Sequence, residues 1–315
     1  MPGTLAWAPE TVYDYGNARI AGARSRLVDR DGLRRLQEAS TPAAMMAMLE
    51  GLEDWRPIVA EVSSFGAPPA QAIDLAIERY RSRRLAALVR WYAAPIRDLV
   101  EALVLFLDGE RLVAVTRRRR AGEPPDRIGA AVSPGAVLDA EAIGFLARAS
   151  SMAGLLERAA AAGLLTRTDA RAVARMAEAG RPPEEVESAL VVAMDAARLE
   201  RASGSSQDSR RVTEIIEGEL AVRAAASAEA SEAGVAVAAL GEREATVSRL
   251  DLLARLGRRD PLGIGAVAAY VAAVEAGAIR LRATLTGVIA GWPAELVGEY
   301  LAPGTARRPR SVAVG

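Results

Sequence analysis

Apolar residues recur three and four positions apart along most of the chain, which is the spacing that places them on one face of an α-helix. One such stripe lies between residues 13 and 27, and a longer one between residues 264 and 285. No segment alternates apolar and polar residues over the length of a half-buried strand. The pattern therefore predicts an all-α protein. The first stripe consists of Tyr13, Gly16, Ile20, Ala23 and Leu27, and the second of Ile264, Val267, Val271, Val274, Ala278, Leu281 and Leu285.

Capping and breaking residues divide this pattern into successive helices. Thr41 followed by Pro42 is typical of a helix start, because the hydroxyl caps the first turn and proline fits the first helical position. Ser151 is a second candidate cap. We expect helices at 13–27, 42–55, 70–92, 96–120, 152–162, 169–178, 183–201, 213–231, 243–257 and 262–285, a turn at 133–135, a linker at 203–209, a last helix from Trp292-Pro293, and a loose basic tail after Pro303.

A weak internal repeat accompanies these helices. Arginine-bearing helical segments start at Tyr13, Asp108 and Glu217, and each is followed by a capped or proline-started helix. Self-similarity of this kind is the mark of a repeat architecture. We interpret it as three similar helical domains at residues 1–105, 106–207 and 208–315.

Composition limits the chemistry. Hydrophobic residues make up 51% of the chain but aromatic residues only 4%, as expected for helix packing rather than sheets. Histidine and cysteine are absent, which excludes a Ser-His-Asp triad, a thiolate nucleophile and an ordinary zinc site. No glycine-rich phosphate loop is present. We expect no catalytic residue, metal, cofactor or direct nucleotide binding.

Charge and hydropathy favour a cytosolic protein. The charges balance to zero, so no overall field attracts nucleic acid or an anionic membrane, and the absence of cysteine rules out disulfides. The first ten residues lack the basic and apolar regions of a signal peptide. The apolar run from Gly263 to Ile279 is short for a membrane span and contains Glu275, so we expect a buried helix there.

Two blocks of sequence resemble a known family. Tyr15-x-Asn17-Ala18-Arg19, followed by a basic stretch, resembles the N-terminal motif of the C subunits of V/A-type rotary ATPases, which are homologous to the d subunits of eukaryotic V-ATPases. The second block runs from Asp260-Pro261-Leu262-Gly263 through Ala269-Tyr270, Glu275 and an Ile-Arg-Leu-Arg element to Gly291-Trp292-Pro293.

A weaker third block lies between them, and it departs from the family pattern. It reads Asp108-x-x-Arg111-Leu112, where the family usually has asparagine in place of Arg111. The corresponding asparagine of the last repeat is Leu220, and the second glutamate of the C-terminal block is Gly277. Residues 181–209 match poorly. These differences concern the polar lining of the middle and last repeats rather than the fold.

The resemblance implies a funnel-shaped array of three helical domains with approximate three-fold symmetry. Such a protein seats the lower end of the central shaft, formed by the D and F subunits, and rests on the membrane ring of proteolipid subunits. It is peripheral on the cytoplasmic face of the membrane, turns with the rotor and transmits torque without doing chemistry. It has no nucleic-acid partner.

Several residues are expected to contact partners, and others to hold the fold. Arginine suits partner contacts because its planar fork pairs with carboxylates and helix-end carbonyls. The candidate partner-binding residues are Tyr15, Asn17, Arg19, Arg24, Arg26, Arg117, Arg118, Arg280 and Arg282. The candidate structural residues are Asp260, Pro261, Gly263, Tyr270 and Glu275.

Alternatives stay open for the polar candidates. Asn17 fits a buried amide at a helix end as well as a partner contact. Arg19 fits an internal ion pair or a partner contact. Arginines 117–120 fit a solvated helix end, an acidic partner or headgroup, or nucleic acid. Glu275 and Arg282 are seven residues apart, too far to pair with each other along one helix, so we expect each to find a partner on another helix.

The remaining residues favour structural roles. Asp260 is expected to be an N-cap with Pro261 at the first helical position. Gly263 and Gly265 indicate a close approach of helices rather than a nucleotide loop. The aromatic residues expected in the core are Tyr13, Tyr15, Trp55 and Trp91.

Two other functions compete with the rotor subunit. A helical protein that binds nucleic acid or anionic membranes through its arginine-rich segments would lose affinity steeply with salt. An enzyme with paired carboxylates would need two acids on one helical face, and no such constellation is evident.

Overall fold

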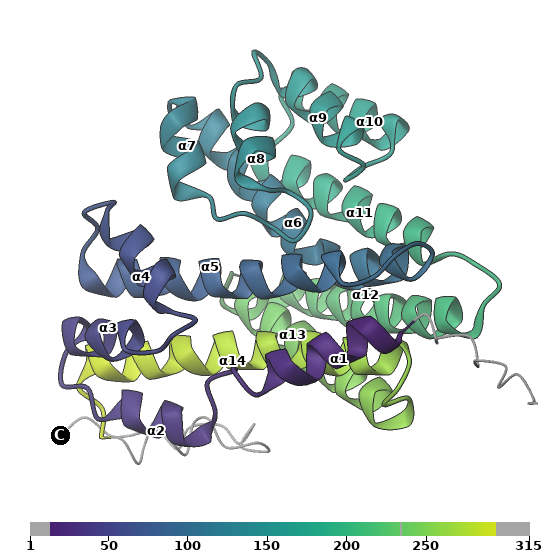
Figure 1. Cartoon of the computed structure of the whole chain (residues 1–315). Helices are drawn as coiled ribbons and strands as arrows, with labels where there is room; N and C mark the ends of the chain where they lie inside the picture. Colours follow the sequence, from purple (N-terminus) through teal and green to yellow (C-terminus); the bar gives the residue numbers. More distant parts are fainter. Residues whose placement is uncertain (1–12, 234, 294–315) are drawn as a thin grey trace, which may run out of the picture. The chain divides into compact units, whose positions relative to one another are not determined.

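The computed structural model describes residues 13–233 and 235–293, with side chains for 13–225 and 246–293. These residues form fourteen helices and no strand, which confirms the all-α class (Figure 1). The helices are α1 Asp14–Arg24, α2 Arg30–Gln37, α3 Pro42–Glu50, α4 Arg56–Ser63, α5 Pro69–Arg90, α6 Ile96–Arg120, α7 Pro125–Ala131, α8 Ala140–Ala147, α9 Met152–Ala161, α10 Arg167–Glu178, α11 Pro183–Ala202, α12 Gln207–Ala233, α13 Val235–Arg259 and α14 Ile264–Ala290.

Local capping chemistry sets several of these boundaries. Thr41 and Ser151 accept hydrogen bonds from the backbone N–H groups of Ala44 and Gly154, at 3.2 and 3.0 Å, so both predicted caps are confirmed. The predicted linker at 203–209 was too long, because α12 already starts at Gln207, where the hydroxyl of Ser206 receives the N–H of Ser209. The expected last helix and basic tail lie beyond residue 293, outside the described residues.

Residue contacts divide the chain into two units. One unit consists of Met1–Ser25 with Ser82–Val274, and the other of Arg26–Arg81 with Glu275–Gly315. The division therefore falls within α5 and within α14. The funnel, its three-fold symmetry and the boundaries 1–105, 106–207 and 208–315 stay predictions.

The smaller unit is built around two aromatic rings. Trp55, at the start of α4, is 1% exposed and stacks on Tyr80 of α5 with the ring centres 4.3 Å apart. The Tyr80 hydroxyl donates a hydrogen bond to the backbone carbonyl of Arg26 at 3.3 Å. Aliphatic residues from α2 to α5, together with Ala278, Leu281 and Leu285 of α14, complete this core. Trp55 is thus a core residue, as its sequence context predicts.

The larger unit is organised around α6. Both faces of α6 are buried over most of its length, which is unusual for a helix that ends in four arginines. Its apolar residues pack against α7 to α11, and α11 lies alongside it. Helices α12 and α13 form a long antiparallel pair, visible as neighbouring green ribbons in Figure 1.

Helix α14 has the length and apolarity of a membrane span. In the described part of the chain it is the one helix that passes this test, and 61% of its most apolar stretch is buried within the protein. All seven residues of the predicted stripe from Ile264 to Leu285 are buried. Burial of the stripe supports the interpretation of a core helix.

Asp108 fixes the loop that follows α7. It lies inside α6 with no exposed surface, and its carboxylate accepts hydrogen bonds from the backbone N–H groups of Ala136, Val137 and Leu138, the last at 2.7 Å. Gly135 allows this approach, because an added Cβ would lie 1.9 Å from a carboxylate oxygen. The polar residue of the weak third motif is therefore a structural tie.

We predict that Asp108 makes stability depend on pH. Burial raises the pKa of Asp108 from 3.8 to about 6, against the lowering effect of the backbone hydrogen bonds. The folded protein therefore keeps a proton that the unfolded chain releases, and this stabilisation is lost as the pH rises through about 6. Relative to Asp108→Asn, the wild type should gain about 1 kcal/mol between about pH 7.5 and pH 5, measured by urea denaturation.

The matched control is Asp126→Asn on the exposed side of α7. The difference in free energy of unfolding between this variant and the wild type should be nearly constant from about pH 7.5 to pH 5. An equally constant difference for Asp108→Asn would contradict the assignment.

Candidate partner-binding surface

The two sequence blocks that carry the resemblance meet in space. The Asn17 side-chain amide on α1 donates a hydrogen bond to the backbone carbonyl of Leu262, in the loop before α14. The Tyr92 hydroxyl donates to the Asn17 side-chain oxygen at 2.6 Å. Asn17 therefore binds a loose carbonyl next to a helix start and is itself half-buried, which favours its structural interpretation.

The buried side of α1 packs closely on Tyr92. A Cβ on Gly16 would lie 2.2 Å from two atoms of the Tyr92 ring, so only glycine fits at this position. Tyr13 meets the same ring edge-on, with the centroids 6.1 Å apart. Ile20 and Ala23 are also buried, which confirms the predicted stripe as far as Ala23, whereas Leu27 is half-buried and lies beyond the end of α1 at Arg24. Helix α1 is thus held in one rotational setting.

A second polar chain joins three helix starts. The buried Tyr13 hydroxyl donates to Asp208 at the start of α12, at 2.6 Å, and burial followed by this contact raises the pKa of Tyr13 well above its usual value. Arg211 pairs with both Asp208 and Asp260, at 3.3 and 3.0 Å. Asp260 accepts the N–H groups of Gly263 and Gly265 at 3.0 and 3.3 Å. These contacts fix the entry into α14.

The structure corrects one detail of this region. Asp260 caps the entry as expected, but Pro261 is not the first helical residue, because α14 starts only at Ile264. Close packing against the end of α13 explains the intervening turn. A Cβ on Gly265 would lie 2.6 Å from the carbonyl oxygen of Leu256, so the close helix approach predicted for this glycine is confirmed, whereas a Cβ on Gly263 would meet the Asp260 carboxylate at 2.5 Å.

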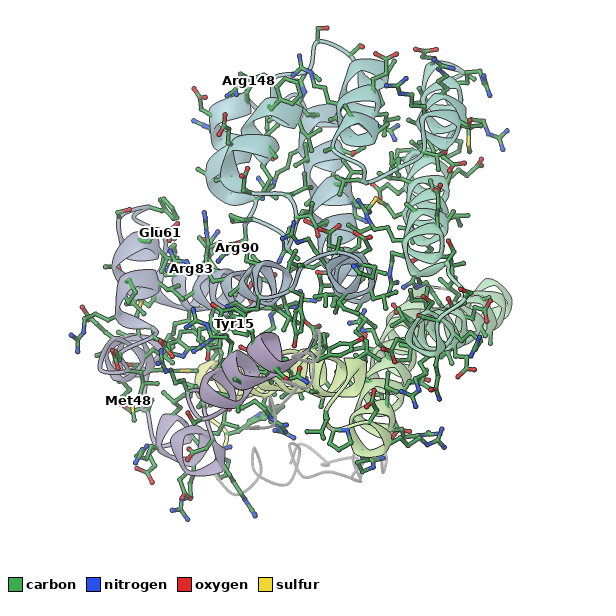
Figure 2. All side chains as sticks on the ribbon, turned by 45° about the vertical axis from the view of Figure 1, so that its right-hand side comes forward. Tyr15, Met48, Glu61, Arg83, Arg90 and Arg148 are labelled. Carbon is green, nitrogen blue, oxygen red and sulfur yellow. The ribbon has the colours of Figure 1, made fainter. Side chains whose placement is uncertain are left out.

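The opposite side of α1 is exposed. Tyr15, which Figure 2 labels on α1, has 65% of its surface exposed, so its expected place in the core was wrong. It lies off the buried face that Gly16 and Ile20 define. The Arg19 guanidinium lies over the Tyr15 ring, 5.7 Å from its centre. Arg19 and Arg24 are exposed and have no ion-pair partner among the residues that the structure describes.

The arginines at the end of α6 have partners within the chain. Arg117 pairs with Glu187 at 2.6 Å while 65% of its side chain stays exposed, and Arg118 pairs with Glu123 at 2.7 Å. All lie in or near the last turn, where the helix dipole favours positive charge. This arrangement supports the interpretation of a solvated helix end.

The remaining basic candidates belong to the smaller unit. Arg282 pairs with Asp74 at 2.8 Å and with Glu78, both on α5. Arg26 has a long contact of 4.0 Å with Asp54. Arg280 is exposed, and no ion pair joins it to another described residue. The partner that was expected for Arg282 on another helix is confirmed.

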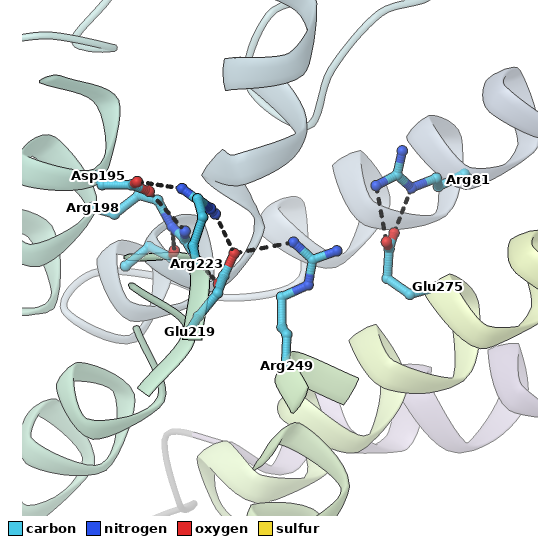
Figure 3. A network of polar contacts seen from close by, with 8 residues as sticks. Arg81, Asp195, Arg198, Glu219, Arg223, Arg249 and Glu275 are labelled. Atoms are coloured by element: carbon cyan, nitrogen blue, oxygen red, sulfur yellow. Dashed lines mark hydrogen bonds and ion pairs between the residues drawn. The ribbon is translucent and has the colours of Figure 1, made fainter. Parts of the chain in front are cut away.

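Glu275 forms a buried ion pair in the smaller unit. It is 3% exposed, and its carboxylate receives two parallel hydrogen bonds from Arg81 of α5, one of them 2.9 Å long (Figure 3). The internal salt bridge expected for Glu275 is therefore confirmed. Tyr270, which lies in the larger unit, is fully buried beside Trp91 with the ring centres 6.1 Å apart, while Trp91 itself is half-buried.

A buried network on α11 to α13 was missed from the sequence. Arg198 is 1% exposed and pairs with Asp195 and Glu219 at 3.1 and 2.8 Å (Figure 3). Arg223 and Arg249 also bind Glu219, at 2.7 and 3.2 Å. Acid and arginine are three residues apart in one pair and four in another, and this helical spacing was the available signal.

Electrostatics keep the network charged. Burial opposes ionisation of Glu219, but attraction to Arg198 and Arg249 outweighs it and lowers the pKa to about 2. The described residues contain no cluster of three or more potential metal ligands. Among the predicted residues of α1, Tyr15, Arg19 and Arg24 are exposed.

We predict that Glu219→Gln strongly destabilises the protein. It leaves the buried Arg198 without its main counter-charge, which should lower the free energy of unfolding by about 3–5 kcal/mol at neutral pH. The deficit should narrow as the pH falls from 4.5 towards 2, where Glu219 itself becomes protonated. Glu217→Gln, on the exposed side of α12, is the control and should change stability by about 0.5 kcal/mol or less. If chemical denaturation shows the same loss of stability for Glu219→Gln and Glu217→Gln, the stabilising role of the network is refuted.

We predict that substitutions of Asn17 and Arg19 differ in their effect on stability. Asn17→Ala removes two hydrogen bonds and should lower the free energy of unfolding by about 1–2 kcal/mol. Arg19→Ala removes only an exposed contact over Tyr15 and should change it by about 0.5 kcal/mol or less. Thermal denaturation of the two variants measures this difference, and a larger loss for Arg19→Ala would make Arg19 structural.

Comparison with known families adds independent information. The family model described as the ATP synthase (C/AC39) subunit matches residues 16–228, more than half of the chain. The match begins within α1, next to Asn17, and ends within α12, so it excludes the block that starts at Asp260. No curated protein matches the chain.

Proposed function

The chain belongs to the C/AC39 subunit family of V/A-type ATP synthases, and on this premise we propose that it is a non-catalytic rotor subunit. In this role it joins the central shaft, formed by the D and F subunits, to the membrane ring of proteolipid subunits. It works as a peripheral protein on the cytoplasmic face of the membrane. Its task is to pass torque between two neighbours.

Transmission of torque requires a body that does not deform. The buried ion pairs support this role, because a charged pair inside a protein holds its helices at a fixed separation and is costly to break. Arg81 with Glu275 joins α5 to α14, and Arg198 with Glu219 joins α11 to α12. Tightly packed helices around these pairs resist compression.

The observation that carries the proposal is the exposed face of α1. Tyr15 and Arg19 form an amphipathic pair there, with a flat ring under a guanidinium that still has its hydrogen-bond donors available. Aromatic residues and arginine are the residues most enriched at the energetic centres of protein interfaces. The rest of α1 is locked by Asn17 and Gly16, so this pair is presented in a fixed position.

Nucleic acid and anionic membranes fit the chain less well. The formal net charge is zero, whereas affinity for either polyanion grows with the number of available positive charges. Arg117 and Arg118, the first two of the four arginines at the end of α6, already have carboxylate partners. A steep fall of nucleic-acid affinity with salt would favour this alternative.

We predict that Arg19→Glu weakens assembly without unfolding the chain. A complex of the D and F subunits should be retained by the immobilised wild-type chain, and the charge reversal should weaken that complex about tenfold or more. The measurement is surface-based binding at low salt, with thermal denaturation as the test of folding. Arg171→Glu, at an exposed position of α10, provides the matched control and should bind like the wild type. Failure of the wild type to retain D and F would contradict the proposed function.

A further inference from the structure

A groove of about 450 Å³ lies between α12 and α13 of the larger unit. None of the residues that line it belongs to α1. Ile215 and Leu256, which are 5% and 8% exposed, contribute an apolar floor. Four arginines line it, two from each helix, and Glu214 is the one acidic residue among the lining side chains.

The four arginines differ in whether a carboxylate neutralises their charge. Arg211 is held by Asp208 and Asp260, and Arg255 by Asp251 at 3.0 Å. The guanidinium of Arg210 donates to the carbonyl oxygen of Ser205 at 2.8 Å, which leaves its charge unneutralised. Arg259 has no ion pair with any residue that the structure describes. The groove thus has two fixed arginines and two that lack a carboxylate.

The spacing of these residues matches a helical partner. Arg255 and Arg259 are four residues apart on α13, and Leu252 and Leu256 repeat at the same interval, so charge and apolar surface run side by side for two turns. A groove with an apolar floor receives the apolar side of an amphipathic helix. Arginine at its rim selects carboxylates, which it binds through paired N–H groups.

We propose that this groove is a docking site for an acidic amphipathic helix of a neighbouring subunit. The apolar residues of that helix lie on Ile215 and Leu256, and its glutamates or aspartates pair with Arg210 and Arg259. The identity of the neighbour as a subunit rests on the proposed function, but the chemistry of the groove does not. The groove is thus a second partner-binding surface, distant in sequence from α1.

The test uses a fluorescein-labelled helical peptide with a leucine stripe flanked by glutamates. Its counterpart has glutamine at every glutamate position. Fluorescence anisotropy with the full chain should show binding of the glutamate peptide that weakens as salt is raised, and about tenfold weaker binding of the glutamine peptide. The double variant Arg210→Glu/Arg259→Glu should lose affinity for the glutamate peptide by about tenfold or more.

Arg258→Glu is the matched control. It makes the charge change of one of the two groove substitutions on the residue next to Arg259, at an exposed position that does not line the groove, and should bind within about twofold of the wild type. Equal affinity for the two peptides, or equal effects of the double variant and the control, would overturn the proposal.

A second measurement tests the proposal without the double variant, in case Arg210→Glu/Arg259→Glu does not fold. The chain has no cysteine, so Gln207→Cys places a single dye at the groove in an otherwise unchanged protein. The glutamate peptide should change the dye emission at the concentrations that saturate anisotropy, and inorganic phosphate at the same ionic strength should not. No change with the peptide, or the same change with phosphate, would also overturn the proposal. Neither experiment contains D or F, so a negative result leaves the proposed function standing.

Discussion

Buried arginine paired with carboxylate is the interaction on which both units depend. Arg198 is 1% exposed and Arg81 5%, and neither could stay inside the protein without its counter-charge. A guanidinium has a planar array of donors that can bind several acceptors at once, so one Arg198 holds Asp195 and Glu219 together. Because breaking such a pair is far more costly than breaking a surface pair, it fixes the registry of long helices that apolar packing of Ala and Leu would leave free to slide.

Buried arginine–carboxylate pairs also suit the mechanical role that we propose for a chain without histidine or cysteine, because that role needs a stiff body and no catalytic group. Stiffness comes from helix packing, buried pairs and ties such as Asp108, while binding is left to polar groups at the surface. These properties suit the rotor role that we propose, in which the chain connects moving neighbours. We propose Tyr15 and Arg19 as one surface for that connection, and the groove between α12 and α13 as a second.

Periodicity and capping chemistry were sufficient to predict much of the fold. The stripes from Tyr13 to Ala23 and from Ile264 to Leu285 are buried, and the caps at Thr41 and Ser151 are in place, because each depends on residues close together in sequence. The expected core position of Tyr15 was wrong because it was inferred from aromatic character alone, whereas the helical spacing already places Tyr15 off the stripe that Gly16 and Ile20 define. Asp108 and Arg198 were missed because their partners lie on segments whose position only the folded chain determines.

Electron cryomicroscopy of the intact ATPase purified from its native membrane tests the central claim most directly. We expect density for this chain between the lower end of the shaft and the proteolipid ring, with Tyr15 and Arg19 of α1 in contact with another subunit. A chain located on the stator, or one that is absent from the purified ATPase altogether, would contradict the rotor role.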